Sequence, residues 1–174
     1  MRSRIRPAAE ADSPALAHIL TACATESPAS LGFVSQASAQ RHLNAAQEVN
    51  EWQAEADFFP ESRILWVAED NATPVGFAYL MLGSKRPTPQ VPQAAGWKLH
   101  RLMVHPAHQG QGHGRRLITA CLAELALRQA KGMFLVVYET QQQALALYQS
   151  LGLQPVHTEQ ENKFLRLHYM ATTF

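Results

Sequence analysis

A glycine-rich segment, set between a strand-like run and an amphipathic helix, constrains this chain more than any other feature. It covers residues 104–116, contains three glycines within five positions, and ends with Arg115 and Arg116. Glycine lets a backbone turn tightly and approach a ligand closely, and the unpaired N–H groups at a helix start bind anions with help from the helix dipole. We therefore expect the segment to hold an anionic ligand that contains a diphosphate.

The segment matches neither of two well-known phosphate-binding loops. A Walker loop ends in Gly-Lys-Ser/Thr, whereas Gly114 is followed here by Arg115 and Arg116. The dinucleotide fingerprint GxGxxG, begun at Gly110 and Gly112, needs a glycine where Arg115 stands. A nucleotide-binding protein that uses this turn is therefore the least favoured hypothesis.

The rest of the chain alternates strand-like and helix-like patterns. Strands are expected at residues 4–6, 64–68, 75–80, 97–104, 133–138, 155–159 and 164–170, which are rich in β-formers. Helices are expected over residues 13–23, 43–59, 117–126 and 144–151, where apolar residues recur every three or four positions. This order predicts a single α/β domain over residues 1–174, with a mixed sheet and at least one parallel strand pair.

Local signals predict where some of these elements begin and end. Asp12 is expected to cap the first helix, Pro60 to end the second, and Lys131 with Gly132 to close the third. Residues 83–96 contain three prolines and lack periodicity, which predicts a surface loop. Loops of this length inside a compact domain are often functional.

Composition narrows the classes of function. The 15 Lys and Arg residues nearly balance the 14 Asp and Glu residues, so no overall field attracts nucleic acid or an anionic membrane. The two cysteines, Cys23 and Cys121, fall on apolar helix faces without metal-ligand spacing, so we expect neither a disulfide framework nor a zinc site. The sequence shows no signal peptide and no apolar stretch long enough to span a bilayer, and we expect a cytoplasmic protein.

Two motifs in the right order resemble one protein family. The pattern Gln109-x-x-Gly112-x-Gly114 is similar to the Gln/Arg-x-x-Gly-x-Gly/Ala pyrophosphate loop of the GNAT family of N-acetyltransferases. The family's upstream Val-x-Pro pattern is also present, as Val104 and Pro106. Residues 144–153 resemble the family's Ala-x-x-Leu-Tyr-x-x-x-Gly-Phe segment, and residues 5–8 resemble its usual start. The resemblance covers essentially the whole chain.

The resemblance implies a fold and a cofactor site. The fold would be the acyl-CoA N-acyltransferase fold: a central, mostly antiparallel sheet with one parallel, splayed strand pair and about four flanking helices. The cofactor would be acetyl-CoA, as a co-substrate, without a metal. Backbone amides of the turn would hold its pyrophosphate, at Gln109, Gly110, Gln111, Gly112, His113, Gly114 and Arg115. The pantetheine arm would pair with Met103 and Val104 and contact Gln141, which stands where the family often has asparagine.

The resemblance also implies a reaction, direct transfer of an acetyl group to a primary amine of a small molecule or peptide within a ternary complex. Tyr148 matches the family's tyrosine acid, and a phenol with a pKa of about 10 is protonated at neutral pH. The same tyrosine is alternatively a core residue of its amphipathic helix. A backbone N–H at Met103 or Val104 would polarise the thioester carbonyl.

The general base stays open. The strand before the turn carries no carboxylate, where family members often have one. His100, Glu69, Asp70, Glu139 or a chain of water molecules are the candidates, and His100 has a suitable ordinary pKa. The missing carboxylate motivates an alternative, a catalytically silent acyl-CoA sensor or interaction module.

Three histidines near the turn invite a metal-site hypothesis. His105, His108 and His113 are close in sequence, but Pro106 and the glycines deny them the i, i+4 face of a zinc-binding helix. We expect these histidines to pack or to face solvent, and we expect no metal.

The acceptor is not readable from the sequence. Trp52 and Phe59 have the spacing of core residues, and Glu48, Glu51 and Glu55 form what is usually a solvated helix face. We expect an amine acceptor and neither nucleic acid nor membrane as partners. A homodimer is left open, because no residue pattern argues for one.

Overall fold

The computed structural model describes residues 3–28, 35–83, 96–160 and 166–173. Most of the expected surface loop at 83–96, and the expected turn before the last strand, lie outside these residues. The chain divides into two compact units. The first contains residues 1–80 and 101–121, and the second contains residues 81–100 and 122–174. Among the described helices, none has the length and apolar character needed to cross a membrane.

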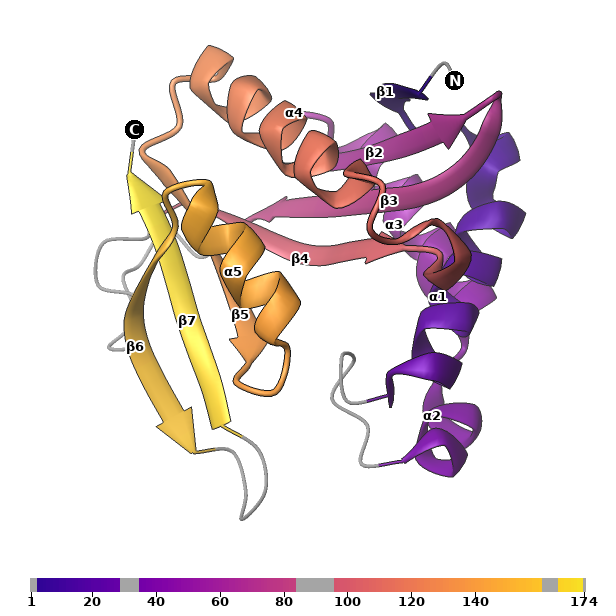
Figure 1. Ribbon diagram of the computed structural model, residues 1–174. Coiled ribbons are helices and arrows are strands. Elements are labelled where there is room, and N and C mark those ends of the chain that lie inside the picture. Colours follow the sequence, from indigo (N-terminus) through magenta and orange to yellow (C-terminus); the bar gives the residue numbers. More distant parts are fainter. Residues whose placement is uncertain (1–2, 29–34, 84–95, 161–165, 174) are drawn as a thin grey trace. The chain divides into compact units, whose positions relative to one another are not determined.

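The strands form a mixed sheet whose hydrogen-bonded order is β1-β2-β3-β4-β5-β7-β6 (Figure 1). Its strands are β1 (Ser3–Pro7), β2 (Arg63–Asp70), β3 (Thr73–Leu82), β4 (Trp97–Val104), β5 (Gly132–Tyr138), β6 (Gln154–Gln160) and β7 (Arg166–Thr173). The pairs β1/β2, β5/β7 and β6/β7 are antiparallel, and β4/β5 is parallel. The described residues also contain five α-helices, α1 to α5. The expected fold class, a mostly antiparallel sheet with one parallel pair and flanking helices, is confirmed.

The parallel pair is short. Its register joins Trp97 to Met133 and Lys98 to Phe134, all in the second unit. Strand β4 continues for six residues beyond Lys98 and β5 for four beyond Phe134. The ladder therefore stops near the start of β4, as a splayed pair requires.

The core of the first unit lies between its helices and its strands. Helices α1 (Ser13–Glu26) and α3 (Ala45–Phe58) cover apolar side chains of β2 and β3. Trp52 of α3 stacks on Tyr79 of β3, with ring centroids 5.4 Å apart. The expected role of Trp52 as a core residue is confirmed, whereas the side chain of Phe59 is more than half exposed.

The expected helix over 43–59 forms as α3, and a separate helix, α2 (Gln36–His42), precedes it where none was expected. Helix α2 ends at His42, with Leu43 as its C-cap residue, and α3 begins at Ala45. Asn44 separates them because its side-chain oxygen accepts a hydrogen bond from the Gln47 amide, which is the bond of a helix N-cap. Leu43, the first apolar residue of the expected helix, therefore lies before the helix begins.

The expectation that the Asp12 side chain caps the first helix is wrong. Asp12 precedes α1, but its backbone is already helical and its carboxylate makes no cap bond to α1. Its oxygens accept from the Ala9 amide at 2.8 Å and from the Arg6 guanidinium at 2.7 and 2.8 Å. The carboxylate joins β1 to the short 3-10 helix η1 (Glu10–Asp12) instead.

The second unit contains β5, β6, β7 and helix α5 (Gln142–Ser150), with β7 between β5 and β6 (Figure 1). Its helix ends at Gly152, which has a positive φ of 88° and serves as the expected closing glycine. The expectation that Lys131 and Gly132 close the third expected helix is wrong. Helix α4 (His113–Leu127) ends before Lys131, the left-handed residue after it is Gln129, and Gly132 already belongs to β5.

Candidate functional site

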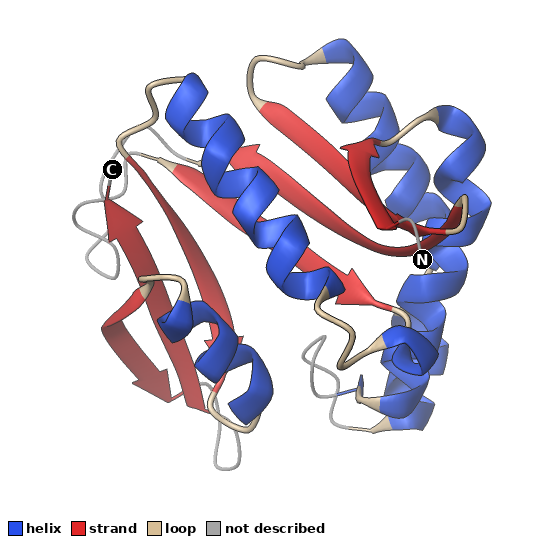
Figure 2. Ribbon diagram, turned by 45° about the horizontal axis from the view of Figure 1, so that its top comes forward, coloured by secondary structure: helices blue, strands red, loops and turns tan. Residues whose placement is uncertain are grey.

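The glycine-rich segment is a tight turn that leads from the end of β4 into the start of α4 (Figure 2). A short 3-10 helix, η3 (Pro106–His108), follows β4, and the turn then passes through Gly110 and Gly112. These two glycines have φ values of +73° and +81°, which L side chains adopt only with strain. An added Cβ would meet no atom within 4 Å at either glycine. Backbone conformation, and not space, is what requires glycine here.

The start of α4 exposes backbone donors just after this turn. The first helical hydrogen bond runs from the Arg116 amide to the Gly112 carbonyl at 3.1 Å. The amides of His113, Gly114 and Arg115 therefore belong to the first turn, whose N–H groups have no helical acceptor. Arg115 and Arg116 are both exposed and add positive charge at this end. Donors, helix dipole and charge together favour an anion at this start of a helix.

The turn is tied to the end of β4 by side-chain and backbone bonds. The Gln109 side chain donates from Nε2 to the Val104 carbonyl at 3.1 Å, and the Cys23 thiol donates to the same oxygen at 3.3 Å. The His105 amide donates to the Val75 carbonyl at 2.8 Å and extends the β3/β4 ladder past Val104. These bonds hold the strand end and the turn in one geometry.

Two other residues implied by the family resemblance, Tyr148 and Gln141, belong to the second unit, whereas the turn belongs to the first. Tyr148 lies in α5 and is 8% exposed. Burial raises its pKa, so its phenol is protonated at neutral pH. Gln141 is the N-cap residue of α5 but makes no side-chain cap bond, and its backbone amide donates to the Tyr138 carbonyl at 2.9 Å.

The candidate bases have different surroundings. Glu69 accepts from the Arg6 guanidinium at 2.6 Å, and Glu139 lies 3.5 Å from Arg166 at a half-exposed position. His100 is a partly buried residue of β4 in the second unit. Asp70 ends β2 and has a buried oxygen, Oδ1, without a hydrogen-bond partner in the part of the chain that the structure describes. Glu69 and Glu139 are thus engaged by cations.

The sequence did not indicate that the Glu55 carboxylate is partly buried in the first unit and has fixed partners there. The Glu55 oxygen Oε2 accepts from the Tyr79 hydroxyl and from Nε of Arg63, the latter at 2.8 Å. Burial, and then the hydrogen bond to Glu55, raise the pKa of Tyr79. The helical spacing predicted a solvated row of glutamates, but β2 and β3 bring an arginine and a tyrosine to Glu55. No local signal in the sequence indicates this.

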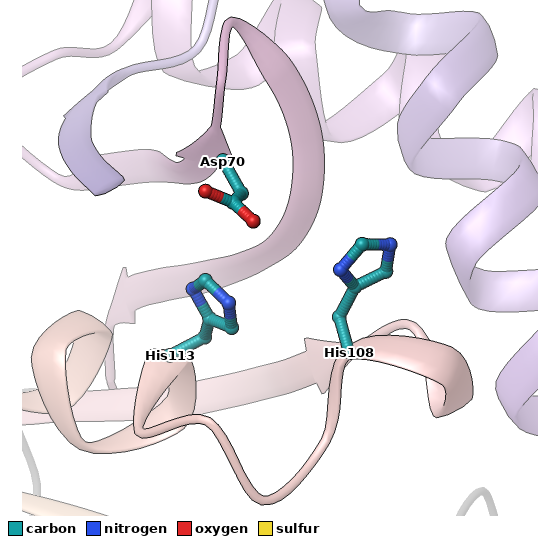
Figure 3. A group of neighbouring side chains, drawn as sticks. All are labelled: Asp70, His108 and His113. Carbon is teal, nitrogen blue, oxygen red and sulfur yellow. The ribbon is translucent and has the colours of Figure 1, made fainter. Parts of the chain in front are cut away.

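Two of the three histidines near the turn meet a carboxylate from another strand. Ligand atoms of Asp70, His108 and His113 all lie within 4.8 Å of one another, and the three side chains point toward a common centre (Figure 3). His105 is not part of this group, and its ring stacks on His18 at 5.4 Å and lies edge-on to His108 at 5.9 Å. Sequence reasoning considered the three histidines alone, because Asp70 is 38 positions before His108 and is brought near by the fold.

The sheet with its short parallel pair, and the glycine turn that feeds a helix start, define an acyl-CoA N-acyltransferase fold. A family model described as an acetyltransferase (GNAT) domain matches residues 61–155, more than half of the chain. The chain therefore belongs to the GNAT acetyltransferase family, as its motifs indicated. No curated protein sequence matched the chain significantly.

Solved structures share the fold at low sequence identity. PaiA N-acetyltransferase from Thermoplasma acidophilum, in complex with coenzyme A, is 15% identical over 100% of both chains, with a TM-score of 0.78. Ribosomal-protein-alanine N-acetyltransferase from Brucella melitensis is 23% identical over 98% of this chain and 99% of its own, with a TM-score of 0.76. YncA, a putative acetyltransferase from Salmonella typhimurium with acetyl-CoA, is 21% identical over 99% and 94%, with a TM-score of 0.73.

Proposed function

We propose that this chain is an acetyl-CoA-dependent N-acetyltransferase that moves an acetyl group to a primary amine of a small molecule or peptide. The observation that carries the proposal is the turn at Gly110 and Gly112, where two left-handed glycines precede the start of α4. Such a turn presents backbone N–H groups and a helix dipole to a diphosphate. Two solved structures with the same fold hold coenzyme A or acetyl-CoA, which agrees with that ligand.

The thioester would lie beside the last residues of β4. The Val104 carbonyl is already occupied, because it accepts hydrogen bonds from Gln109 and Cys23. The groups proposed for the pantetheine arm and the acetyl carbonyl are therefore the backbone N–H groups at Met103 and Val104. An N–H aimed at that carbonyl would stabilise the negative charge that develops when the amine attacks. Loss of one such donor typically costs about a hundredfold or more in rate.

In the proposed reaction, the amine nitrogen attacks the thioester carbonyl carbon and forms the C–N bond. The C–S bond then breaks, its electron pair leaves with sulfur, and Tyr148 donates a proton to the thiolate. The amine loses its proton to a base or to water. Direct transfer within a ternary complex needs no acyl-enzyme. Because burial raises the pKa of Tyr148, this phenol would carry the required proton throughout the neutral range.

The base in this proposal is His100, a carboxylate or a chain of water molecules. The ion pairs of Glu69 with Arg6 and of Glu139 with Arg166 argue against these two carboxylates, because a proton on either would weaken its pair. A His100→Gln variant tests the imidazole directly. If His100 is the base, the acidic limb of the kcat/KM profile should disappear in this variant.

A thiol-release assay with the full chain and acetyl-CoA tests the function. The panel of acceptors should contain polyamines, amino acids, aminoglycosides and peptides with free N-termini, with calorimetry of coenzyme A binding in parallel. Release of free thiol that depends on one acceptor class supports the enzyme and identifies its substrate. Binding without turnover on any acceptor would favour the acyl-CoA sensor, and absence of binding would overturn both.

A further inference from the structure

We propose that Asp70, His108 and His113 form a binding site for a divalent transition-metal ion of the zinc and cobalt type. The three residues come from the end of β2, from η3 and from the first position of α4. Their ligand atoms lie within 4.8 Å of one another, and Figure 3 shows the carboxylate and both rings directed at one point. All three belong to the first unit. The metal site uses the side chain of His113, whose backbone amide is separately proposed to hold the diphosphate, and its test measures metal binding without acetyl transfer.

Two of the ligand atoms are buried and unsatisfied, which is the second observation behind the site. His113 is 2% exposed, and its Nε2 has no hydrogen-bond partner among the described residues. Oδ1 of Asp70 is also a buried atom without a hydrogen-bond partner among the described residues. A buried polar atom without a partner costs about 1–3 kcal/mol, so each such atom in a native fold calls for an explanation. A cation between them would satisfy both.

The donor set selects the class of ion. Two imidazole nitrogens and one carboxylate oxygen suit zinc and neighbouring first-row metals, and three protein ligands leave one position of a tetrahedral site open. Metal–ligand bonds of about 2.1 Å put tetrahedral ligand atoms roughly 3.4 Å apart. The group must therefore contract from its present spread. His108 is only partly buried and lies in the short η3, so its ring is the ligand proposed to move.

Arg116 competes with the ion through the other nitrogen of His113. Nη2 of Arg116 lies 3.0 Å from Nδ1 of His113, and a guanidinium only donates, so the ring proton sits on Nε2 in this arrangement. Ligation through Nε2 needs the opposite tautomer. Ser3 Oγ, 3.5 Å from the same Nδ1, is the acceptor available for the displaced proton. Metal binding should thus require the exposed Arg116 side chain to leave the ring.

This competition gives the site a signature that a mere histidine cluster would lack. Removal of the Arg116 donor should tighten metal binding, whereas removal of the Ser3 hydroxyl should weaken it about tenfold. Nonspecific binding to exposed histidines responds to neither change. The two variants therefore separate a built site from adventitious binding.

Cobalt(II) chloride and zinc sulfate are the probes, used with the full chain carrying no histidine tag. Cobalt(II) titration followed by visible absorption, with zinc competition and calorimetry, should show one saturable site per chain. Asp70→Asn and His108→Ala should each weaken binding more than about tenfold. His157→Ala is the matched control, because His157 is an exposed histidine of β6 in the second unit and packs on Tyr169. Arg116→Ala and Ser3→Ala complete the set.

The proposal is overturned if the parent chain shows no saturable cobalt binding. It is equally overturned if Asp70→Asn and His108→Ala bind cobalt as the parent does, or if His157→Ala loses binding as they do. Circular dichroism shows which variants fold. If Asp70→Asn does not fold, the partly exposed His108→Ala decides the question together with the opposite effects expected for Arg116→Ala and Ser3→Ala.

Discussion

A Cβ atom at Gly76 would lie 2.8 Å from the carbonyl oxygen of Met103. Such a distance is closer than real Cβ contacts, so β3 and β4 approach here only because residue 76 lacks a side chain. The next nearest atoms belong to Val104, at 3.2 and 3.4 Å. The backbone proposed to face the thioester is thus held in place by a glycine on the neighbouring strand.

Gly76→Ala should displace the backbone at Met103 and Val104. We expect a stability loss of about 1–3 kcal/mol, the usual cost of overpacking, and weaker coenzyme A binding. Gly83→Ala is the matched control, because its Cβ would also meet a carbonyl oxygen at 2.8 Å, that of Gly96. Urea unfolding should show similar losses for both, whereas calorimetry should show weaker binding for Gly76→Ala alone. Equal affinity in the two variants would contradict this.

Gly112→Ala should weaken coenzyme A binding about tenfold. The positive φ of +81° makes an L residue costly here, by about 1–2 kcal/mol, so the turn should relax and its amides should lose alignment. Gly152→Ala carries the same kind of strain at φ +88° and likewise meets no atom within 4 Å. Calorimetry should find near-normal affinity in that control. Unchanged affinity in Gly112→Ala would remove the turn from the cofactor site.

Tyr148→Phe should lower kcat about a hundredfold or more and leave the KM for acetyl-CoA within about twofold, if the phenol protonates the departing thiolate. Because burial raises its pKa above the ordinary value of about 10, this group should add no falling limb to the pH–rate profile below that pH. Tyr169→Phe is the control, since the Tyr169 hydroxyl bonds Glu159 on the neighbouring strand. Full activity in Tyr148→Phe would assign Tyr148 to the core only.

Asp12→Asn should cost about 2 kcal/mol of unfolding free energy at pH 7. The hydrogen bond from Arg6 is the largest cause that lowers the pKa of Asp12 in the folded chain. A lowered folded pKa means that this contribution is complete above the unfolded value of about 3.9 and disappears as pH falls through the folded value. The difference between parent and variant should therefore be constant near neutrality and shrink below about pH 4.

Urea unfolding at several pH values measures this difference. Glu124→Gln is the control, because Glu124 in α4 pairs with Arg128 just after the end of this helix, and such i, i+4 pairs contribute about 0.3–0.5 kcal/mol. A constant difference for Asp12→Asn down to pH 2 would show that the carboxylate charge plays no part.

Much of the fold could be predicted from local patterns. Four strands begin and end within two residues of their expected bounds, because their β-forming runs are unbroken. They are those expected at 64–68, 75–80, 97–104 and 133–138. The glycine turn was identified because a positive φ leaves glycine as the unstrained choice. Gly152 behaves in the same way at the end of α5. In each case the signal lies within a few neighbouring residues.

The expectations that were wrong concern polar side chains that can bind more than one partner. Asp12 has the sequence position of a helix cap, but Arg6 on β1 offers a bidentate ion pair that attracts the carboxylate more strongly. Glu55 has the spacing of a solvated helix face, yet Arg63 and Tyr79 reach it from β2 and β3. The period of a helix says which face a residue occupies, and not which strand lies opposite.

The sequence alone determined the family, the order of the strands and of four of the five described helices, and the turn that is proposed to bind the diphosphate, because these depend on backbone conformations encoded by neighbouring residues. The tertiary structure alone brought Asp70 to His108 and His113, placed Gly76 against Met103, and gave Arg6 two carboxylate partners. Those relationships depend on strand pairing between residues far apart in the chain. Contact at such separations is set by the register of the sheet, which no local pattern encodes.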